Sequence, residues 1–182
     1  MNILEIRTLR GPNYWSGYWK KLIIMRLDIG DYEEKPSNKI KGFYKRLKEV
    51  LPSLHSHGCS YGEDGGFFKR VEEGTWAGHI IEHFALELQT LAGMDVGYGR
   101  TRETSDRGIY NVVFAYYEEE VGRYVGRAAV RLFLDLAEGK PVDEIKQTIE
   151  KEIREMREIR EEVRFGPSTG SLVEEAESRN IP

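Results

Sequence analysis

The sequence has one cysteine, no long hydrophobic run and no excess of basic residues, and each absence excludes a class of protein. With Cys59 alone, no internal disulfide can form, and a zinc site built from thiolates is not expected. No apolar run approaches the ~20 residues that span a bilayer. A net charge of −4 gives the chain no general attraction to nucleic acid or to an anionic membrane, so we expect neither as a partner.

The N-terminus also lacks the layout of a signal peptide, in which basic residues precede an apolar stretch. We therefore expect a cytoplasmic protein. The length of 182 residues fits one domain of ordinary size, and we predict a single domain over residues 1–182.

The most informative stretch is residues 75–92, which we predict to be an amphipathic helix. Thr75 is a suitable N-cap, and Gly93 can adopt the left-handed conformation just after the last turn. At 3.6 residues per turn the apolar side chains gather on one face and the polar ones on the other. The apolar face contains Ile80, Ile81, Phe84, Leu88 and Leu91, and the polar face contains His79, Glu82, His83 and Glu87.

The polar face predicts a metal site. His79 and His83 are four residues apart, the spacing that directs two imidazoles at one ion from a single helix, and Glu82 lies between them. This is the order His-x-x-Glu-His of the inverted zincins, in which the histidines bind zinc and the glutamate handles the proton of the attacking water. The alternative is a solvated polar face whose histidines contact nothing.

The third metal ligand is not fixed by this pattern. Glu87 is eight residues from His79, about 12 Å along the helix axis, which is too far for both side chains to reach one ion without strain. It could instead orient His83 through a hydrogen bond. The acidic cluster Glu118–Glu120 is a better source, with Glu119 as the candidate, although acidic residues also suit the start of a helix.

The loop over residues 55–66 contains the other two histidines and the cysteine. His55 and His57 could supply a metal ligand if the loop is held rigidly; otherwise the loop is a plain connection. Cys59 can be interpreted as a nucleophile beside these histidines or as a small buried hydrophobic residue, and nothing nearby indicates an activated thiolate.

Residues 94–108 follow the motif helix and are rich in arginine. They do not predict a phosphate loop, because they follow a helix and precede a strand, the reverse of the order that such loops need. Arg100, Arg102 and Glu103 lie directly downstream of the predicted metal helix. Arginines there would suit a substrate carboxylate or an oxyanion. The alternative is a solvated charged hairpin.

The remaining patterns predict an α+β domain, with an antiparallel or mixed sheet of four to five strands, the motif helix packed on it and a helical C-terminal third. We predict strands at residues 2–9, 20–29, 65–71 and 109–117, and helices at 38–50, 118–138, 142–164 and 166–180. Residues 119–164 should form a helical hairpin. The aromatic loop at residues 10–19 is either a binding surface or a cover over the edge of the core.

Several stretches of the chain resemble the N-terminal domain of cyanophycin synthetases. They are residues 9–16 (LRGPNYWS), 25–28 (MRLD), 99–104 (GRTRET), 122–132 (GRYVGRAAVRL) and 166–169 (GPST), together with the Glu-Gly-Thr, Gly-His-Ile-Ile-Glu-His, Ala-Leu-Glu-Leu-Gln and Leu-Ala-Gly-Met segments of residues 73–94. The resemblance extends over essentially the whole chain.

The resemblance implies a domain that precedes an ATP-grasp domain and a Mur-ligase-like domain, which together build a polyaspartate backbone carrying arginine on each side chain. It implies a holder for this polymer that in some members is also a metallopeptidase producing short primers. His79, Glu82 and His83 match the family motif, and Glu87 and Glu119 match family positions.

Two hypotheses follow. In the first, zinc held by His79, His83 and Glu119, or less well by Glu87, activates a water that cuts the polymer, with Glu82 as the base and Arg100 or Arg102 beside the oxyanion. In the second, the domain is a non-catalytic clamp or docking module. It would grip the charged polymer through Arg100, Arg102, Glu103 and the Glu118 cluster.

Overall fold

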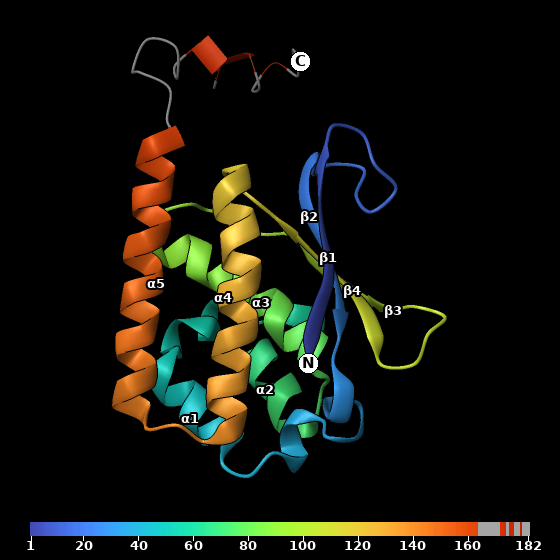
Figure 1. Ribbon diagram of the computed structural model, residues 1–182, viewed down its shortest axis with the longest axis vertical. Helices are drawn as coiled ribbons and strands as arrows, with labels where there is room; N and C mark the ends of the chain where they lie inside the picture. The colour runs from blue at the N-terminus through green and yellow to red at the C-terminus, as the bar shows by residue number, and fades with distance from the viewer. Residues whose placement is uncertain (164–171, 174, 177–178, 180–182) are drawn as a thin grey trace.

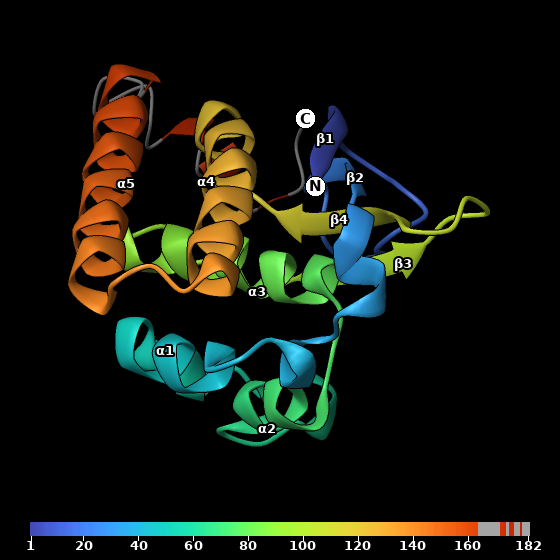
Figure 2. The same cartoon turned by 60° about the horizontal axis from the view of Figure 1, so that its bottom comes forward.

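The computed structural model describes residues 1–163, 172–173, 175–176 and 179 (Figure 1). These form a four-stranded sheet with helices packed on one side of it (Figure 2). The predicted α+β class and the antiparallel sheet of four strands are therefore confirmed. The helix predicted at residues 166–180 falls mostly outside the described residues.

The sheet has the strand order β1-β2-β4-β3, and all neighbouring strands are antiparallel. Its strands are β1 (Asn2–Arg10), β2 (Lys21–Asp28), β3 (Gly99–Glu103) and β4 (Ile109–Ala115). The central strands β2 and β4 are near-continuous apolar runs, and consecutive side chains, which point to opposite faces of the sheet, are buried in both. The shorter and more polar β3 is an edge strand.

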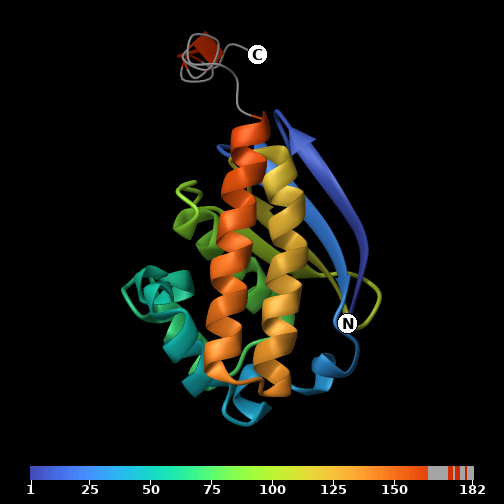
Figure 3. The same cartoon turned by 60° about the vertical axis from the view of Figure 1, so that its left-hand side comes forward.

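Two long helices form the outer layer of the molecule. Helix α4 (Glu119–Glu138) ends at Gly139, whose positive φ of 78° permits the turn into α5 (Val142–Val163). The two run side by side in opposite directions (Figure 3). Glu152 of α5 is buried at their contact, where it accepts hydrogen bonds from Tyr124 and Arg131 of α4.

The predicted motif helix is α3 (Ala77–Leu91), and it packs against strands β3 and β4 and against helices α4 and α5 (Figures 1 and 2). The apolar face is buried as expected, and Gly93 has a φ of 86°. The polar face is buried as well, including Glu82, His83 and Glu87. Thr75 is not the N-cap. That place belongs to Trp76, and the Thr75 hydroxyl contacts His79 instead.

The strand predicted at residues 65–71 is wrong, because the segment is helix α2 (Gly66–Glu73). Phe67, Phe68 and Val71 are buried together, a spacing that one helical face satisfies and an alternating strand does not. The β propensity of the two aromatic residues is overridden by this packing. Gly65, with a φ of 80°, begins the helix.

The first predicted helix begins later than expected. Residues 37–39 form a short 3-10 turn, and α1 (Phe43–Val50) starts only after Gly42, whose φ is 71°. Three further 3-10 turns, Gly30–Glu34, Pro52–Ser56 and Cys59–Tyr61, complete the described elements. None of the described helices combines the length and the apolar character required to cross a membrane.

The aromatic loop between β1 and β2 supports both interpretations of its sequence. Trp15 and Trp19 pack against the core, whereas Tyr14 and Tyr18 are each 82% exposed. The side chain of Asn13 holds the loop in shape, since it accepts from the backbone N–H groups of residues 15 and 16 and donates to two carbonyls.

Candidate metal and catalytic site

The polar face of α3 forms one wall of a cleft of about 650 Å³. Its other walls are the loop of residues 56–60 and the segment of residues 96–102, which includes strand β3. The cleft lining contains five of the residues selected from the sequence: His79, Glu82, His83, Arg100 and Arg102. The fold therefore brings the histidine motif and the arginine pair to one cavity.

Two glycines allow α3 to approach β3 closely. A Cβ on Gly78 would lie 3.1 Å from the Thr101 side chain, and a Cβ on Gly99 would lie 2.4 Å from Oε1 of Glu82. The second distance is shorter than any side chain tolerates. Gly99 therefore makes the space that the Glu82 carboxylate occupies.

Glu82 is buried and held in one position. The Thr101 hydroxyl donates a hydrogen bond of 2.6 Å to its Oε2. Burial raises the pKa of Glu82 to about 7, against the opposing effects of the Thr101 hydrogen bond and of the positive charges of Arg102 and Arg100. A carboxyl group with such a pKa can accept or donate a proton near neutral pH.

His79 is fixed from both of its ring nitrogens. Nδ1 lies 3.0 Å from the Thr75 hydroxyl, and Nε2 lies 3.3 Å from Sγ of Cys59. Burial, with a smaller contribution from the positive charge of Arg70, lowers the pKa of His79 to about 4. The imidazole is therefore neutral, the form in which histidine binds metal ions.

His83 is held by stacking and by a second histidine. Its ring stacks on Phe67 with 4.1 Å between ring centroids, and its Nδ1 lies 2.8 Å from Nδ1 of His57. Burial, followed by the neighbouring rings of His79 and His57, keeps the pKa of His83 well below its ordinary value. Both motif histidines are thus neutral and rigidly placed.

Cys59 completes a cluster with these two histidines. One possible ligand atom from each of Cys59, His79 and His83 lies within 4.8 Å of the others. The backbone of Cys59 has a φ of 49°, the left-handed region that residues other than glycine seldom adopt. Two neutral imidazoles and one sulfur form a donor set that suits zinc, with a fourth position left for water or substrate.

The other histidine of this loop, His57, links His83 to Glu87. Its Nε2 lies 2.8 Å from Oε2 of Glu87. Burial is the largest single influence on Glu87 and would raise its pKa, but the hydrogen bonds from His57 and Ser53 and the charge of His57 together lower the pKa, and the carboxylate accepts. A neutral His57 that donates from Nε2 accepts at Nδ1. His83 then donates from Nδ1, which leaves its Nε2 lone pair for a metal ion.

We expect a His57→Ala variant to bind zinc about 10–100-fold more weakly, as is usual when a partner that orients a metal ligand is lost. Competition with a chromophoric chelator measures the affinity. His55→Ala is the matched control, since His55 is exposed and lies in the same loop. Equal zinc affinity in both variants would show that the contact between His57 and His83 does not orient the ligand.

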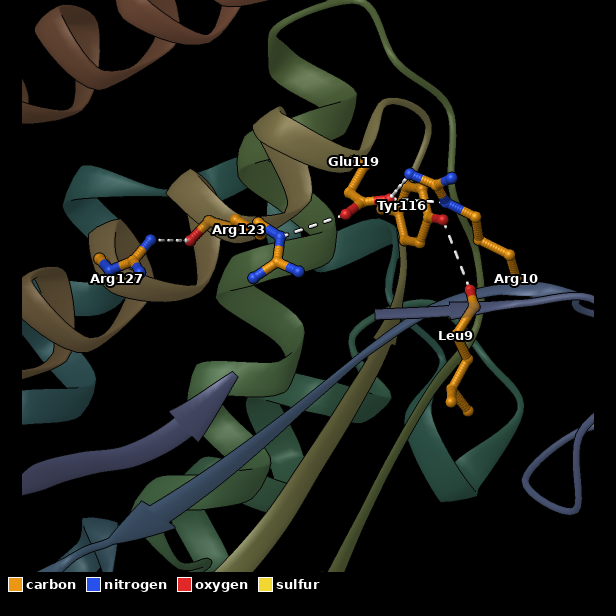
Figure 4. A network of polar contacts seen from close by, with 6 residues as sticks. All are labelled: Leu9, Arg10, Tyr116, Glu119, Arg123 and Arg127. Atoms are coloured by element: carbon orange, nitrogen blue, oxygen red, sulfur yellow. Dashed lines mark hydrogen bonds and ion pairs between the residues drawn. The ribbon is translucent and has the colours of Figure 1, made fainter. Parts of the chain in front are cut away.

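Glu119 lies outside this cluster. Its carboxylate accepts from Arg10 and from Arg123, and Tyr116 lies beside it (Figure 4). These contacts lower the pKa of Glu119 although its partial burial would raise it. Glu119 therefore forms ion pairs at the start of α4, whereas Cys59 lies with the two histidines. Glu87 contacts His57 rather than the cluster.

Arg100, Arg102 and Glu103 all lie on β3 and are exposed. In the described part of the chain the side chain of Arg100 makes no hydrogen bond or ion pair, and that of Arg102 donates only to the carbonyl of residue 101. Both guanidinium groups are thus available to a ligand in the cleft. Glu103 is on the same strand but does not line the cleft.

Sequence reasoning did not identify Cys59 as a candidate ligand or His57 as a partner of His83. The available signal was the spacing of His55, His57 and Cys59 at every second residue in one glycine-rich loop. This spacing alone does not bring the side chains together, because it does so only if the loop is held rigidly. The structure shows what holds this loop: the backbone N–H of Gly65 donates to residue 55, and that of Phe67 donates to residue 57.

Comparison with known proteins shows two kinds of similarity. The model of the family described as "Cyanophycin synthase-like N-terminal domain" matches residues 24–138. The chain is 56% identical over 184 residues to the cyanophycin synthetase of Crocosphaera subtropica, and 56% identical over 182 residues to that of Synechocystis. Each alignment covers the whole of this chain but only 21% of the relative.

Proposed function

Because the chain belongs to the family of cyanophycin synthase-like N-terminal domains, we propose that it binds cyanophycin, the polymer of aspartate and arginine, and hydrolyses its backbone into primers. The observation that carries this proposal is the cleft. It places a buried glutamate, a cluster of two histidines and a cysteine, and two unpaired arginines around one space.

Each residue has a role that its surroundings support. Cys59, His79 and His83 would hold a zinc ion, which when bound polarises a carbonyl and makes water more acidic. Glu82 takes the proton of the water that attacks the peptide carbonyl carbon. When the C–N bond breaks, Glu82 returns this proton to the leaving amine nitrogen. Arg100 and Arg102 pair with carboxylates of the polymer.

The place of this domain in a larger protein is also part of the proposal. The chain spans about a fifth of the length of the curated relatives it matches. We propose that ATP-grasp and Mur-ligase-like domains elongate the chain ends that this domain exposes by cutting. A cut at an internal peptide bond produces two chains from one, so each cut creates a new end for synthesis.

A second function, binding without cleavage, is supported by the unpaired arginines. Arg100 and Arg102 would grip carboxylates whether or not zinc is present. In this case Glu82 and the histidine cluster take no part.

The experiment compares the two functions directly. The purified chain is incubated with soluble polymer in the presence of zinc, or with a chelator, and chain length is followed by gel electrophoresis. We expect shortening with zinc and none with the chelator. Binding without shortening would leave the clamp as the function, and an absence of both would overturn both proposals.

A further inference from the structure

Strand β3 has a free edge that faces the cleft. Among the described residues it is the last strand of the sheet and pairs only with β4. Residues 99–102 of this strand line the cleft, whereas the other edge strand, β1, contributes no residue to it. An edge strand presents unpaired backbone groups to which a further extended chain can add.

The register identifies which backbone groups of β3 are unpaired. The N–H of Ala115 donates to the carbonyl of Tyr98, and the N–H of Thr104 donates to that of Ile109. Hydrogen-bonded and non-hydrogen-bonded pairs alternate along an antiparallel ladder. The backbone groups of Arg100 and Arg102 are therefore also hydrogen-bonded to β4. The N–H and C=O groups of residues 99, 101 and 103 therefore point away from β4.

The side chain of Arg102 is consistent with this register. Its guanidinium donates to the carbonyl of Thr101, as expected if this carbonyl points away from β4. Within the described residues, the N–H groups of residues 99, 101 and 103 have no backbone or side-chain acceptor. Three backbone N–H groups, at alternate residues along the free edge, are thus available to a further strand.

This free edge passes directly beside Glu82. The carboxylate occupies the space that a Cβ on residue 99 would need, and it accepts from the hydroxyl of Thr101. A chain that hydrogen-bonds to residues 99 and 101 would therefore have its own backbone next to Glu82. The peptide bond to be cut would lie in the cleft between β3 and the histidine cluster.

The two arginines have the spacing of alternate side chains in an extended chain. Arg100 and Arg102 are two residues apart in a strand, about 6.6–6.8 Å, and lie on the same face of β3. An added strand repeats its side chains on that face at the same spacing. In the polymer each aspartate side chain is amide-bonded to an arginine, so its free carboxylate is that of the arginine, and alternate side chains would present one such carboxylate to each guanidinium.

We propose that the polyaspartate backbone binds as a fifth strand on the free edge of β3, with alternate side-chain carboxylates paired to Arg100 and Arg102. The identity of the ligand rests on the proposed function. The binding mode itself is inferred from the register of β3, its unpaired N–H groups and its positive charge. In this mode the domain would select a polymer for its extended backbone as well as for its charge.

Amide hydrogen exchange measured by NMR tests this mode in the full chain. A Glu82→Gln variant is used so that the polymer stays intact.

Before ligand is added, the amides of residues 100 and 102 should exchange slowly and those of 99, 101 and 103 rapidly. With soluble cyanophycin, we expect exchange at 99, 101 and 103 to slow by at least about tenfold, since each gains a hydrogen bond. Unchanged exchange with polymer bound would overturn the proposal, as would a failure to bind.

A pair of variants at Thr101 provides a second test. Thr101→Val and Thr101→Pro both lose the hydroxyl, but only the proline lacks the outward N–H, and proline is tolerated on the free side of an edge strand. We expect the proline variant, in the Glu82→Gln background, to bind the polymer about tenfold more weakly than the valine variant. Equal binding by two folded variants would contradict the added strand. If the proline variant does not fold, the exchange experiment still decides.

These outcomes separate this inference from the proposed function. Protection of the three amides without any cleavage by the unsubstituted chain would leave the strand-binding mode standing and remove the hydrolase. Cleavage without protection of these amides would support the hydrolase and contradict the strand-binding mode.

Discussion

Replacing Glu82 by glutamine is expected to lower the rate of polymer cleavage by about 10²–10⁴-fold, the usual contribution of a general acid or base. The substitution keeps the shape of the side chain, and its amide oxygen can still accept from the Thr101 hydroxyl, which lies 2.6 Å from Oε2 in the structure. What it removes is the ability to take a proton. Chain length after timed incubation with zinc measures the rate.

The matched control for this variant is Glu72→Gln, because Glu72 is exposed on α2 and is not part of the cleft. It changes the net charge by the same amount and should cleave at the original rate. Zinc content and thermal stability should be the same in all three proteins. If the Glu82→Gln variant still cuts the polymer at the original rate, Glu82 is not the base.

The burial of Glu82 explains why a substitution so small should have so large an effect. Four polar residues of α3 are buried, Glu82, His83, Glu87 and Gln89. Gln89 is satisfied by backbone groups, including the carbonyl of Ala115, and serves to join α3 to the sheet. Glu82 instead accepts from the Thr101 hydroxyl, and His83 and Glu87 both contact His57. A core that accepts so many polar groups at one place is typical of a functional site.

The sequence predicted the part of this site that lies on a single helix. The spacing of His79, Glu82 and His83 is local, so it follows from helical periodicity alone. The central strands were predictable for the same kind of reason, because their apolar runs are continuous. What the sequence did not predict depended on contacts between segments far apart in the chain.

Cys59 and α2 are the clearest examples of such contacts. Cys59 reaches His79 only because its loop is bonded to residues 65–67 and its backbone adopts a left-handed conformation. Phe67 and Phe68 favour a strand by propensity, but packing against the core selects a helix. A third ligand sought among carboxylates was the reasonable expectation from composition, since one cysteine cannot build a typical thiolate site.

The proposal that Cys59 is the third zinc ligand leads to a second prediction with a large expected effect, a loss of zinc affinity. We expect Cys59→Ala to weaken zinc binding by more than the ~10–100-fold that is typical of outer partners, because it would remove a direct ligand. Glu119→Gln is expected to leave zinc affinity unchanged, since its carboxylate pairs with Arg10 and Arg123 (Figure 4). Equilibrium competition with a chromophoric chelator compares the two variants with the unsubstituted chain.

Cobalt substitution adds a readout that depends on the sulfur itself. A thiolate bound to Co²⁺ produces a charge-transfer absorption in the near ultraviolet, which imidazole and carboxylate ligands do not. We expect this band in the unsubstituted chain and in Glu119→Gln, and its loss in Cys59→Ala. Loss of metal in Glu119→Gln, with the affinity of Cys59→Ala unchanged, would contradict the assignment. Helix α4 would then have to move its first turn to the cleft, breaking the ion pair between Glu119 and Arg10 that holds it beside β1.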